Sequence, residues 1–146
     1  FKGFNKKFSN AKKTRYDGIL FDSKLECDRY KYLKQLEKEG LIKELKTQYA
    51  FKLIEKGEKQ NHRINSIVRK NSKVISAVKY YADFFYYNVK LGCWIVNDAK
   101  GRTSEVYKLK LKLFLALNGE NFEFLETYRD SKRNNFKEYW NIFKKL

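Results

Sequence analysis

Residues 78–100 read VKYYADFFYYNVKLGCWIVNDAK, and this stretch decides the fold. Val78 to Val89 is rich in aromatic and β-branched side chains, which favour strands, and only Ala82-Asp83 interrupts the run. A short break at Leu91-Gly92 leads to a second apolar run, Cys93 to Ala99. Because two strands joined this tightly pair with each other, the sequence predicts a β-hairpin at the centre of the chain.

The chain before this hairpin predicts a turn, a helix and a strand. Residues 16–19 have the composition of a turn or a short hairpin. Asp22 or Ser23 can cap a helix that runs to about residue 39, and Glu26 completes a capping box with Ser23. Gly40 follows as a typical stop signal. Residues 46–54 alternate in polarity and predict a strand.

The chain after the hairpin predicts a helix, a strand and a closing helix. Residues 103–118 contain a stretch, 108–113, that alternates as a strand would. Their length and the capping residues at their start favour a helix instead. Residues 122–128 predict a strand, and residues 133–145 predict an amphipathic helix. The fold class expected is therefore α/β, with a mixed central sheet built on the hairpin and flanked by helices.

Length and composition narrow the class of protein. The 146 residues fit one domain, here taken as residues 1–146. No stretch approaches the roughly 20 apolar residues that span a bilayer, and no signal segment opens the sequence, so we expect no membrane partner. Cys27 and Cys93 form no CxxC pair, which disfavours zinc and a disulfide framework and favours a reducing cytoplasm.

The charge balance favours a polyanionic partner. Lys and Arg number 33 against 17 Asp and Glu, a net charge of +16. We expect DNA or RNA to be bound mainly through phosphates. Basic residues gather in two segments, an N-terminal arm over residues 1–15 and a polar insertion over residues 55–75. A merely basic protein is the bland alternative; a basic membrane-surface helix has little support, since no segment has a clean apolar face.

Three carboxylates and one lysine are predicted to meet at one corner of this fold. The two-residue period of a strand places Asp98 and Lys100 on one face, and Asp83 lies on the partner strand. Glu26 comes from the preceding helix, whose apolar stripe must pack on the sheet. Oxygen ligands of this kind, with the Ala99 carbonyl as a further one, select Mg²⁺ or Mn²⁺ over zinc. Such a site suits phosphodiester hydrolysis, with the lysine holding or deprotonating water or stabilising the charged transition state.

Each of these residues also has a purely structural interpretation. A lone D-x-K is common and in most proteins marks a surface ion pair. Asp83 is more informative, because Asp is depleted in strands and an unpaired buried charge is costly. Glu26 fits a metal ligand and a capping box equally well. His62, the only histidine, sits in the polar insertion, so a histidine-based site has little support.

Three blocks together resemble the small phage and prophage nucleases of the PD-(D/E)xK type. They read FDSKLECDRY from residue 21, YYADF from residue 80, and VNDAKG from residue 96, the last followed by TSEVYKLK from residue 103. The helical Ser-x-x-Glu is also similar to that of transposon-end nucleases and Holliday-junction resolvases. The resemblance covers roughly residues 14–127. It implies a restriction-endonuclease-like core, metal-binding acids at Glu26, Asp83 and Asp98, and a catalytic Lys100.

The resemblance leaves several points open. Family members commonly carry an acid where this chain has Asn97, which is expected to affect metal affinity or a second ion site. Gln48 occupies a position that is often polar in such families. The expected activity is Mg²⁺-dependent cleavage of DNA, including branched or recombination intermediates, by a homodimer. The alternatives are a non-catalytic nucleic-acid-binding module and a nuclease of structured RNA.

Overall fold

The central hairpin forms as the sequence predicts. In this computed structural model, which describes residues 12–55, 57–58, 62–64, 67–69, 74–100, 103–130, 132 and 135–140, strand β8 (Val78–Asn88) pairs antiparallel with β9 (Cys93–Ala99). Gly92 has a φ of 68°, a left-handed conformation that glycine adopts without steric cost, and its N–H donates to the Asn88 carbonyl. These contacts close the turn between the two strands.

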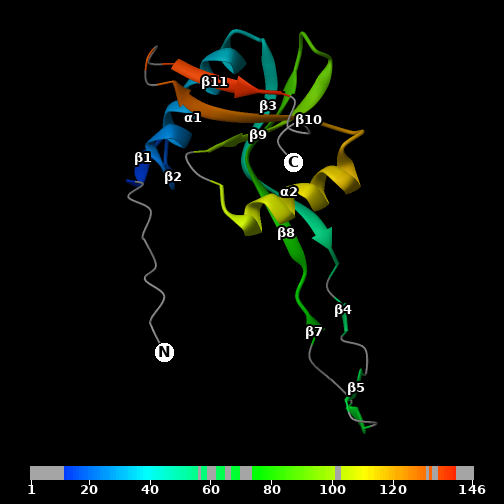
Figure 1. The fold of residues 1–146 in the computed structure, drawn as a ribbon. Helices are drawn as coiled ribbons and strands as arrows, with labels where there is room; N and C mark the ends of the chain where they lie inside the picture. Colours follow the sequence, from blue (N-terminus) through cyan, green and yellow to red (C-terminus); the bar gives the residue numbers. More distant parts are fainter. Residues whose placement is uncertain are drawn as a thin grey trace.

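The hairpin lies inside a five-stranded mixed sheet, shown in Figure 1. The strand order is β11-β10-β9-β8-β3, with β3 (Ile42–Ile54), β10 (Glu123–Asp130) and β11 (Asn135–Tyr139). Only β9 and β10 are parallel, and helix α2 (Glu105–Asn118) connects them, since parallel neighbours need a crossover. The expected α/β class with a mixed central sheet is confirmed.

Two helices cover opposite faces of this sheet. Consecutive residues of β9 show this most clearly, because Ile95 packs in the cluster that contains α1 (Lys24–Lys38) and Val96 packs in the cluster that contains α2. Ser23 caps α1, as predicted. Ser104 caps α2 and accepts a hydrogen bond from the Tyr107 N–H, so the helical interpretation of this segment is confirmed. Neither helix in the described ranges is long and apolar enough to cross a membrane.

The predicted turn at residues 16–19 is a two-stranded hairpin of β1 (Thr14–Tyr16) and β2 (Ile19–Phe21). Asp17 and Gly18 both have positive φ, as a tight hairpin turn requires. The expected basic arm over residues 1–15 is therefore wrong at its end, because residues 14 and 15 belong to β1. Residues 1–11 of that arm lie outside the described part of the chain.

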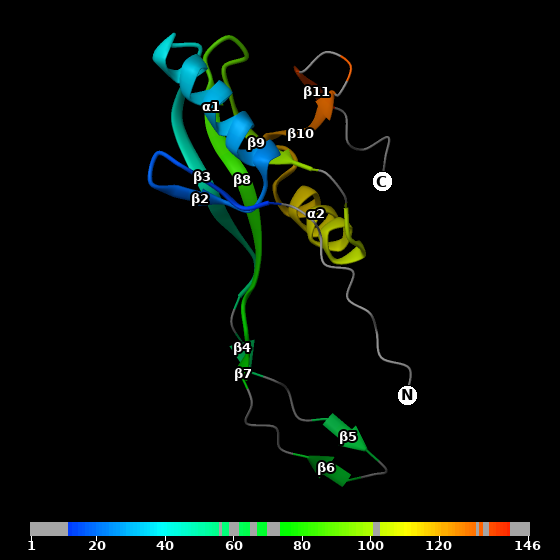
Figure 2. The ribbon, with the colours of Figure 1, turned by 90° about the vertical axis from the view of Figure 1, so that its left-hand side faces the viewer.

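The basic insertion over residues 55–75 extends the hairpin between β3 and β8. Within it β4 (Gly57–Glu58) pairs antiparallel with β7 (Val74–Ile75), and β5 (His62–Ile64) pairs with β6 (Ile67–Arg69). Figures 1 and 2 show these short strands at the far end of β3 and β8, away from the five-stranded sheet. The sequence allowed a long loop or a hairpin extension, and the described strands belong to an extension.

The predicted closing helix is wrong where it can be compared. Residues 135–139 form β11, which pairs antiparallel with β10, and residues 141–145 lie outside the described ranges. The aromatic spacing of this segment suits a helix. The strand is selected instead by contacts distant in sequence, because the Phe136 ring lies 5.8 Å from that of Tyr32 and Glu138 pairs with Arg29. Both partners are on α1.

Candidate functional site

Asp83 and Asp98 face each other where β8 and β9 stop pairing. The last paired residues are Phe84 and Asn97, and beyond them each aspartate binds the opposite backbone. The Asp83 N–H donates to Asp98 Oδ1 over 3.1 Å, and the Ala99 N–H donates to Asp83 Oδ2 over 2.9 Å. Asp98 is fully buried and Asp83 nearly so. The two carboxylates are thus fixed by the strand ends themselves.

The backbone around Asp83 departs from regular alternation. Ala82 packs in the cluster on the α2 side of the sheet, whereas Phe84, two residues later, packs on the α1 side. Although β8 remains one continuous strand, its inward face therefore changes side at the Ala82-Asp83 step that interrupts the apolar run in the sequence. On the neighbouring strand Gln48 has a φ of 50° and donates to Asp83 Oδ1 over 3.2 Å. Left-handed non-glycine residues of this kind are costly and cluster at functional sites.

Lys100 joins the two aspartates. Its Nζ lies 3.3 Å from Asp98 Oδ2 and 3.5 Å from Asp83 Oδ2. The ammonium also lies 4.6 Å from the centre of the Tyr107 ring. Burial acts to lower the pKa of Lys100, but the adjacent carboxylates outweigh it and raise that pKa above its ordinary value. Lys100 is therefore a cation that sits between two acids.

Burial and the Asp98 charge disfavour a negative charge on Asp83. Burial raises the pKa of Asp83 to about 7, with the Asp98 carboxylate as the next cause, and Lys100 opposes both. The Tyr80 hydroxyl donates to Asp98 Oδ2, and burial together with Asp98 raises the Tyr80 pKa well above its usual range. A site of this kind favours any additional cation that can reach the carboxylate oxygens.

Glu26 is near this group but is held by its own helix. Its Oε1 accepts from the Ser23 hydroxyl over 2.9 Å, its Oε2 accepts from the Asp22 N–H over 3.3 Å, and its N–H donates to Ser23 Oγ. Ser23 and Glu26 therefore bond each other as in a capping box, although the backbone N–H that the carboxylate binds is that of Asp22. Burial raises the Glu26 pKa, and its charge acts on both Asp83 and Lys100. The structure therefore brings Asp83, Asp98 and Lys100 into contact and leaves Glu26 beside them.

The acids of this group supply only part of what a divalent cation needs. In the described ranges no three Asp, Glu, His or Cys side chains lie close enough together to hold a metal ion. Two carboxylates are in place, with the third held at the α1 cap. The chemistry of the set fits a hard cation, since every candidate donor is oxygen and the Asp83–Asp98 pair is short of positive charge. For Glu26 to become the third carboxylate ligand, its carboxylate has to leave Ser23.

A further buried acid borders the site and was not predicted. Glu126 of β10 lies directly opposite Asp98 in the parallel register and is only 3% exposed. The Tyr107 and Tyr128 hydroxyls donate to its two oxygens over 3.0 and 2.8 Å. Burial raises the pKa of Tyr107 far above its usual range, with the Asp98 and Glu126 charges as further causes. The signal was present in the sequence: Glu126, like Asp83, interrupts an apolar strand.

Asn97 points away from these acids, as strand alternation predicts. It is fully buried, its Oδ1 accepts from Arg29 Nε over 2.9 Å, and its Nδ2 donates to Thr127 Oγ1 over 2.8 Å. Its role in this chain is to hold α1 and β10 against β9. The missing acid at this position therefore changes the α1 side of the sheet and not the surroundings of Asp98.

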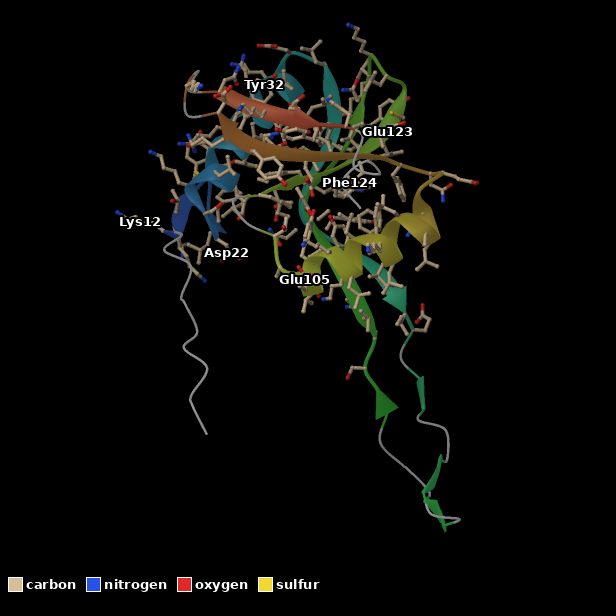
Figure 3. The ribbon with its side chains drawn as sticks, in the orientation of Figure 1. Lys12, Asp22, Tyr32, Glu105, Glu123 and Phe124 are labelled. Carbon is tan, nitrogen blue, oxygen red and sulfur yellow. The ribbon has the colours of Figure 1, made fainter. Side chains whose placement is uncertain are left out.

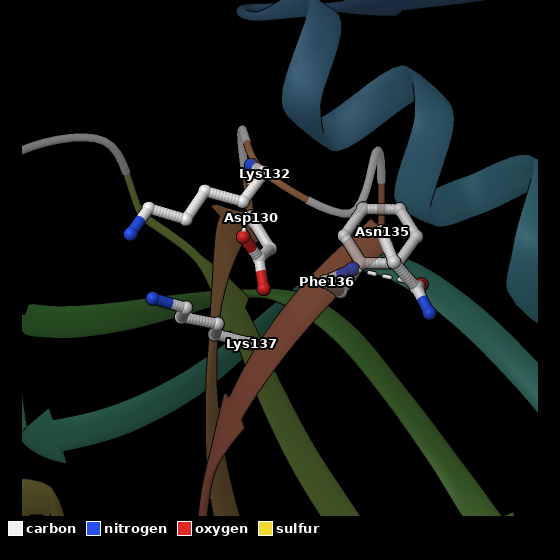
Figure 4. A pocket seen from close by; sticks show the side chains of 5 residues that line it. All are labelled: Asp130, Lys132, Asn135, Phe136 and Lys137. Carbon is white, nitrogen blue, oxygen red and sulfur yellow. Dashed lines mark hydrogen bonds between the residues drawn. The ribbon is translucent and has the colours of Figure 1, made fainter.

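Two further features are the starts of the two helices and a surface pocket. Figure 3 shows Asp22 at the start of α1 and Glu105 at the start of α2. Figure 4 shows a pocket at the turn between β10 and β11 in which Lys132 and Lys137 lie beside Asp130. No residue lining that pocket belongs to the group around Asp98. The acid group and the pocket are separate features.

Comparison with known proteins gives one match. The family model described as "Protein of unknown function (DUF1064)" matches residues 5–137, a range that includes Glu26, Asp83, Asp98 and Lys100. No curated protein and no solved structure matches the chain. Since the matched range covers most of the sequence, the chain belongs to the family described as protein of unknown function DUF1064.

Proposed function

We propose that this chain is a Mg²⁺- or Mn²⁺-dependent endonuclease that hydrolyses DNA phosphodiester bonds on a restriction-endonuclease-like core of the PD-(D/E)xK type. The observation that carries the proposal is the contact of Asp83, Asp98 and Lys100 at the end of the central hairpin. A D-x-K whose lysine lies 18% exposed between two buried carboxylates is unlike an ordinary surface ion pair. Such an arrangement costs stability, which a functional role explains.

Asp83, Asp98, the Ala99 carbonyl and Glu26 would hold the cation. When bound, a divalent ion supplies a polarised water and neutralises charge on the phosphate. The side chains of the protein position the phosphate of the substrate. Lys100 donates to the non-bridging phosphate oxygens as negative charge develops on them. Water gives up one proton to the solvent and attacks phosphorus, the bond to the leaving sugar oxygen breaks, and that oxygen takes up a proton from the solvent, giving a phosphate end and a hydroxyl end.

The partner is proposed from charge. A net charge of +16 on 146 residues suits a polyanion, and the sequence of the insertion between β3 and β8 is itself basic. We extend the proposal to branched or recombination intermediates on the resemblance of the helical Ser-x-x-Glu. Cutting both strands of such a substrate needs two active sites, which a homodimer provides.

The test is a cleavage panel with matched variants. Supercoiled, linear, single-stranded, flap and four-way DNAs, together with structured RNA, are incubated with Mg²⁺, Mn²⁺ or EDTA. We expect metal-dependent cleavage of DNA that is lost in Asp83→Ala, Asp98→Ala and Lys100→Ala. Asp130→Asn is the control, because Asp130 is a buried acid of β10 outside the group. Cleavage in EDTA, or full activity in the three variants, contradicts the proposal, and cleavage of RNA alone redirects it.

A second candidate is a nucleic-acid-binding module without catalysis. It is favoured by the separation of Glu26 from the aspartates, since the described ranges contain no group of three acids ready for a metal. Calorimetric titration with Mn²⁺ distinguishes the two. Heat of binding that disappears in Asp98→Ala supports the nuclease, and its absence from the wild-type protein, with DNA binding intact, supports the module.

A further inference from the structure

The paired strands β3 and β8 form an arm that is distinct from the N-terminal arm of residues 1–15. One exposed face of this strand arm carries two lysines and a tyrosine. Lys52 lies opposite Lys79 and Ala50 lies opposite Tyr81 in the antiparallel register, so all four side chains share a face. The intervening pair of Phe51 and Tyr80 points the other way and packs into the cluster on the α2 side. Lys52, Lys79 and Tyr81 are exposed, Tyr81 by 52%. We name this set the arm face.

The arm face contributes little to folding. Like charges directly opposite each other on neighbouring strands are destabilising, and Lys52 and Lys79 are such a pair. Lys52 reaches Glu55 over 2.9 Å, but both groups are exposed, where an ion pair has little effect on stability. Tyr81 leaves half of an aromatic ring in water. Two cations and a flat ring on one exposed strand face suit a ligand with phosphates and bases.

The arm face lies next to the acid group along both strands, just before the step at which β8 changes its inward face. Asp83 is two residues beyond Tyr81 on β8, and Gln48, two residues before Ala50 on β3, donates to the Asp83 carboxylate. At about 3.3 Å per strand residue, Tyr81 lies roughly 7 Å and Lys79 roughly 13 Å along the strand from Asp83. At the roughly 3.4 Å spacing of a duplex strand these distances correspond to about two and four nucleotides, which is the upper limit because an extended single strand covers more length per nucleotide.

The connection between β3 and β8 is also basic in its sequence. It contains six basic residues and two acids, Glu55 and Glu58; the basic residues are Lys56, Lys59, Arg63, Arg69, Lys70 and Lys73. The sequence of this connection therefore adds to the net positive charge that favours an anionic partner. A second copy of this chain, at +16, would be repelled from the same surface.

We infer that the arm face binds one strand of nucleic acid, with phosphates on Lys52 and Lys79 and an unpaired base stacked on Tyr81. The nucleotides bound are those about two to four positions to one side of the phosphate at Asp83. The register relative to a cut rests on the proposed nuclease function, whereas the binding itself does not. An unpaired base at Tyr81 makes the substrate class a single strand, a flap or a junction and not a continuous duplex.

The test measures binding in EDTA, so that no cleavage intervenes. Fluorescence anisotropy follows a labelled single-stranded oligonucleotide across a salt titration. Lys52→Gln/Lys79→Gln is expected to reduce the slope of log K against log salt by about 1.4 and to weaken binding on the order of tenfold at physiological salt. The control Lys43→Gln/Lys90→Gln removes equal charge at the opposite end of these strands and leaves the slope closer to that of the wild type.

Tyr81 is tested separately from charge. Tyr81→Ser is expected to weaken single-strand binding about tenfold and duplex binding far less, whereas Tyr81→Phe keeps the ring and the affinity. Melting temperatures control for folding, and the double lysine variant should melt no lower than the wild type because it removes a repulsive pair.

Failure of this inference is distinguishable from failure of the proposed function. If the arm-face and control lysine pairs change affinity and slope equally, or Tyr81→Ser binds a single strand as the wild type does, the arm face is not the binding surface, whether or not the protein cuts DNA. If the wild type cuts nothing but the arm-face variants lose binding as described, the inference stands and the nuclease proposal fails.

Discussion

The Asp83 backbone N–H donates a hydrogen bond to Asp98 Oδ1 over 3.1 Å, in the position where a regular ladder would offer a backbone carbonyl. The strands can therefore separate without leaving a buried donor unpaired. The same bond holds two carboxylates together away from water. Its electrostatic consequence is the raised pKa of Asp83, caused first by burial and then by the Asp98 charge.

This pKa predicts how stability depends on pH when no metal is present. The Asp83 pKa rises from 3.8 to about 7 on folding. Between these values the folded state binds more protons than the unfolded state, so the contribution of Asp83 to stability falls as pH rises through this window. Asp83→Asn removes the penalty. We expect it to stabilise the protein more at pH 8 than at pH 5, by up to about 3 kcal/mol.

Urea denaturation in EDTA at both pH values measures this difference. Asp130→Asn, measured in parallel, accounts for the loss of a buried aspartate outside the group. An equal effect of Asp83→Asn at the two pH values contradicts the prediction.

Lys100 is predicted to act on the reaction and not on binding. Lys100→Gln keeps an unbranched polar side chain, one atom shorter, and removes the charge between Asp83 and Asp98. We expect single-turnover cleavage to slow by roughly 10²–10³, the usual effect of removing one group that stabilises transition-state charge. Affinity for DNA in EDTA should change less than twofold to threefold. The control is Lys108→Gln, which removes an exposed lysine paired with Glu105. Equal slowing in both variants would refute a special role for Lys100.

The two interpretations of Glu26 can be separated by two variants. Glu26→Gln preserves the capping box, because Gln serves at that position, but removes the charge that acts on Asp83. Ser23→Ala removes the cap but keeps the charged Glu26 carboxylate. If Glu26 joins the metal site, the first variant loses cleavage with little change in melting temperature. The second should then lose about 1 kcal/mol of stability and keep its activity. The opposite pattern assigns Glu26 to the helix cap alone.

The sequence predicted the elements whose patterns are local. The central hairpin and both helices follow from alternation, caps and glycine stops, and Asp83, Asp98 and Lys100 meet because period-two strands leave few other arrangements. Glu26 was included because its helix packs on the sheet and because its Ser-x-x-Glu resembles that of a nuclease family, and the structure places it beside the group, bonded to Ser23.

The sequence could not predict features that depend on distant contacts. Residues 135–139 carry a helical spacing of aromatics, yet pairing with β10 and burial of Phe136 near Tyr32 make them a strand. Glu126 was overlooked because Tyr107 of α2 and Asp98 of β9 come close to it only in the folded chain. A buried polar side chain in an apolar strand is the one local signal that would have found it.

Arg29 provides the strongest test of the α1 side of the fold. Its guanidinium is 2% exposed and donates from Nε to Asn97. Nη1 lies 2.8 Å from Glu138 Oε1, but its N–H groups are not directed at a hydrogen-bond acceptor, so that contact is an ion pair only. The rings of Tyr32 and Phe136 lie within 5.3 Å of the guanidinium carbon. One side chain thus ties β9 and β11 to α1.

Arg29→Met should therefore lower the free energy of unfolding by about 3 kcal/mol, because it leaves Asn97 Oδ1 buried without its donor and removes the contacts with both rings. Glu138→Gln should lower it by less than about 1 kcal/mol, since that carboxylate is 34% exposed and water can replace its partner. Urea denaturation followed by tryptophan fluorescence measures both. Cleavage by folded Arg29→Met should stay near the wild-type rate, because Asn97 and Asp98 point to opposite faces of β9. Equal losses of stability in the two variants would mean that the surface ion pair, and not the buried guanidinium, holds β11 in place.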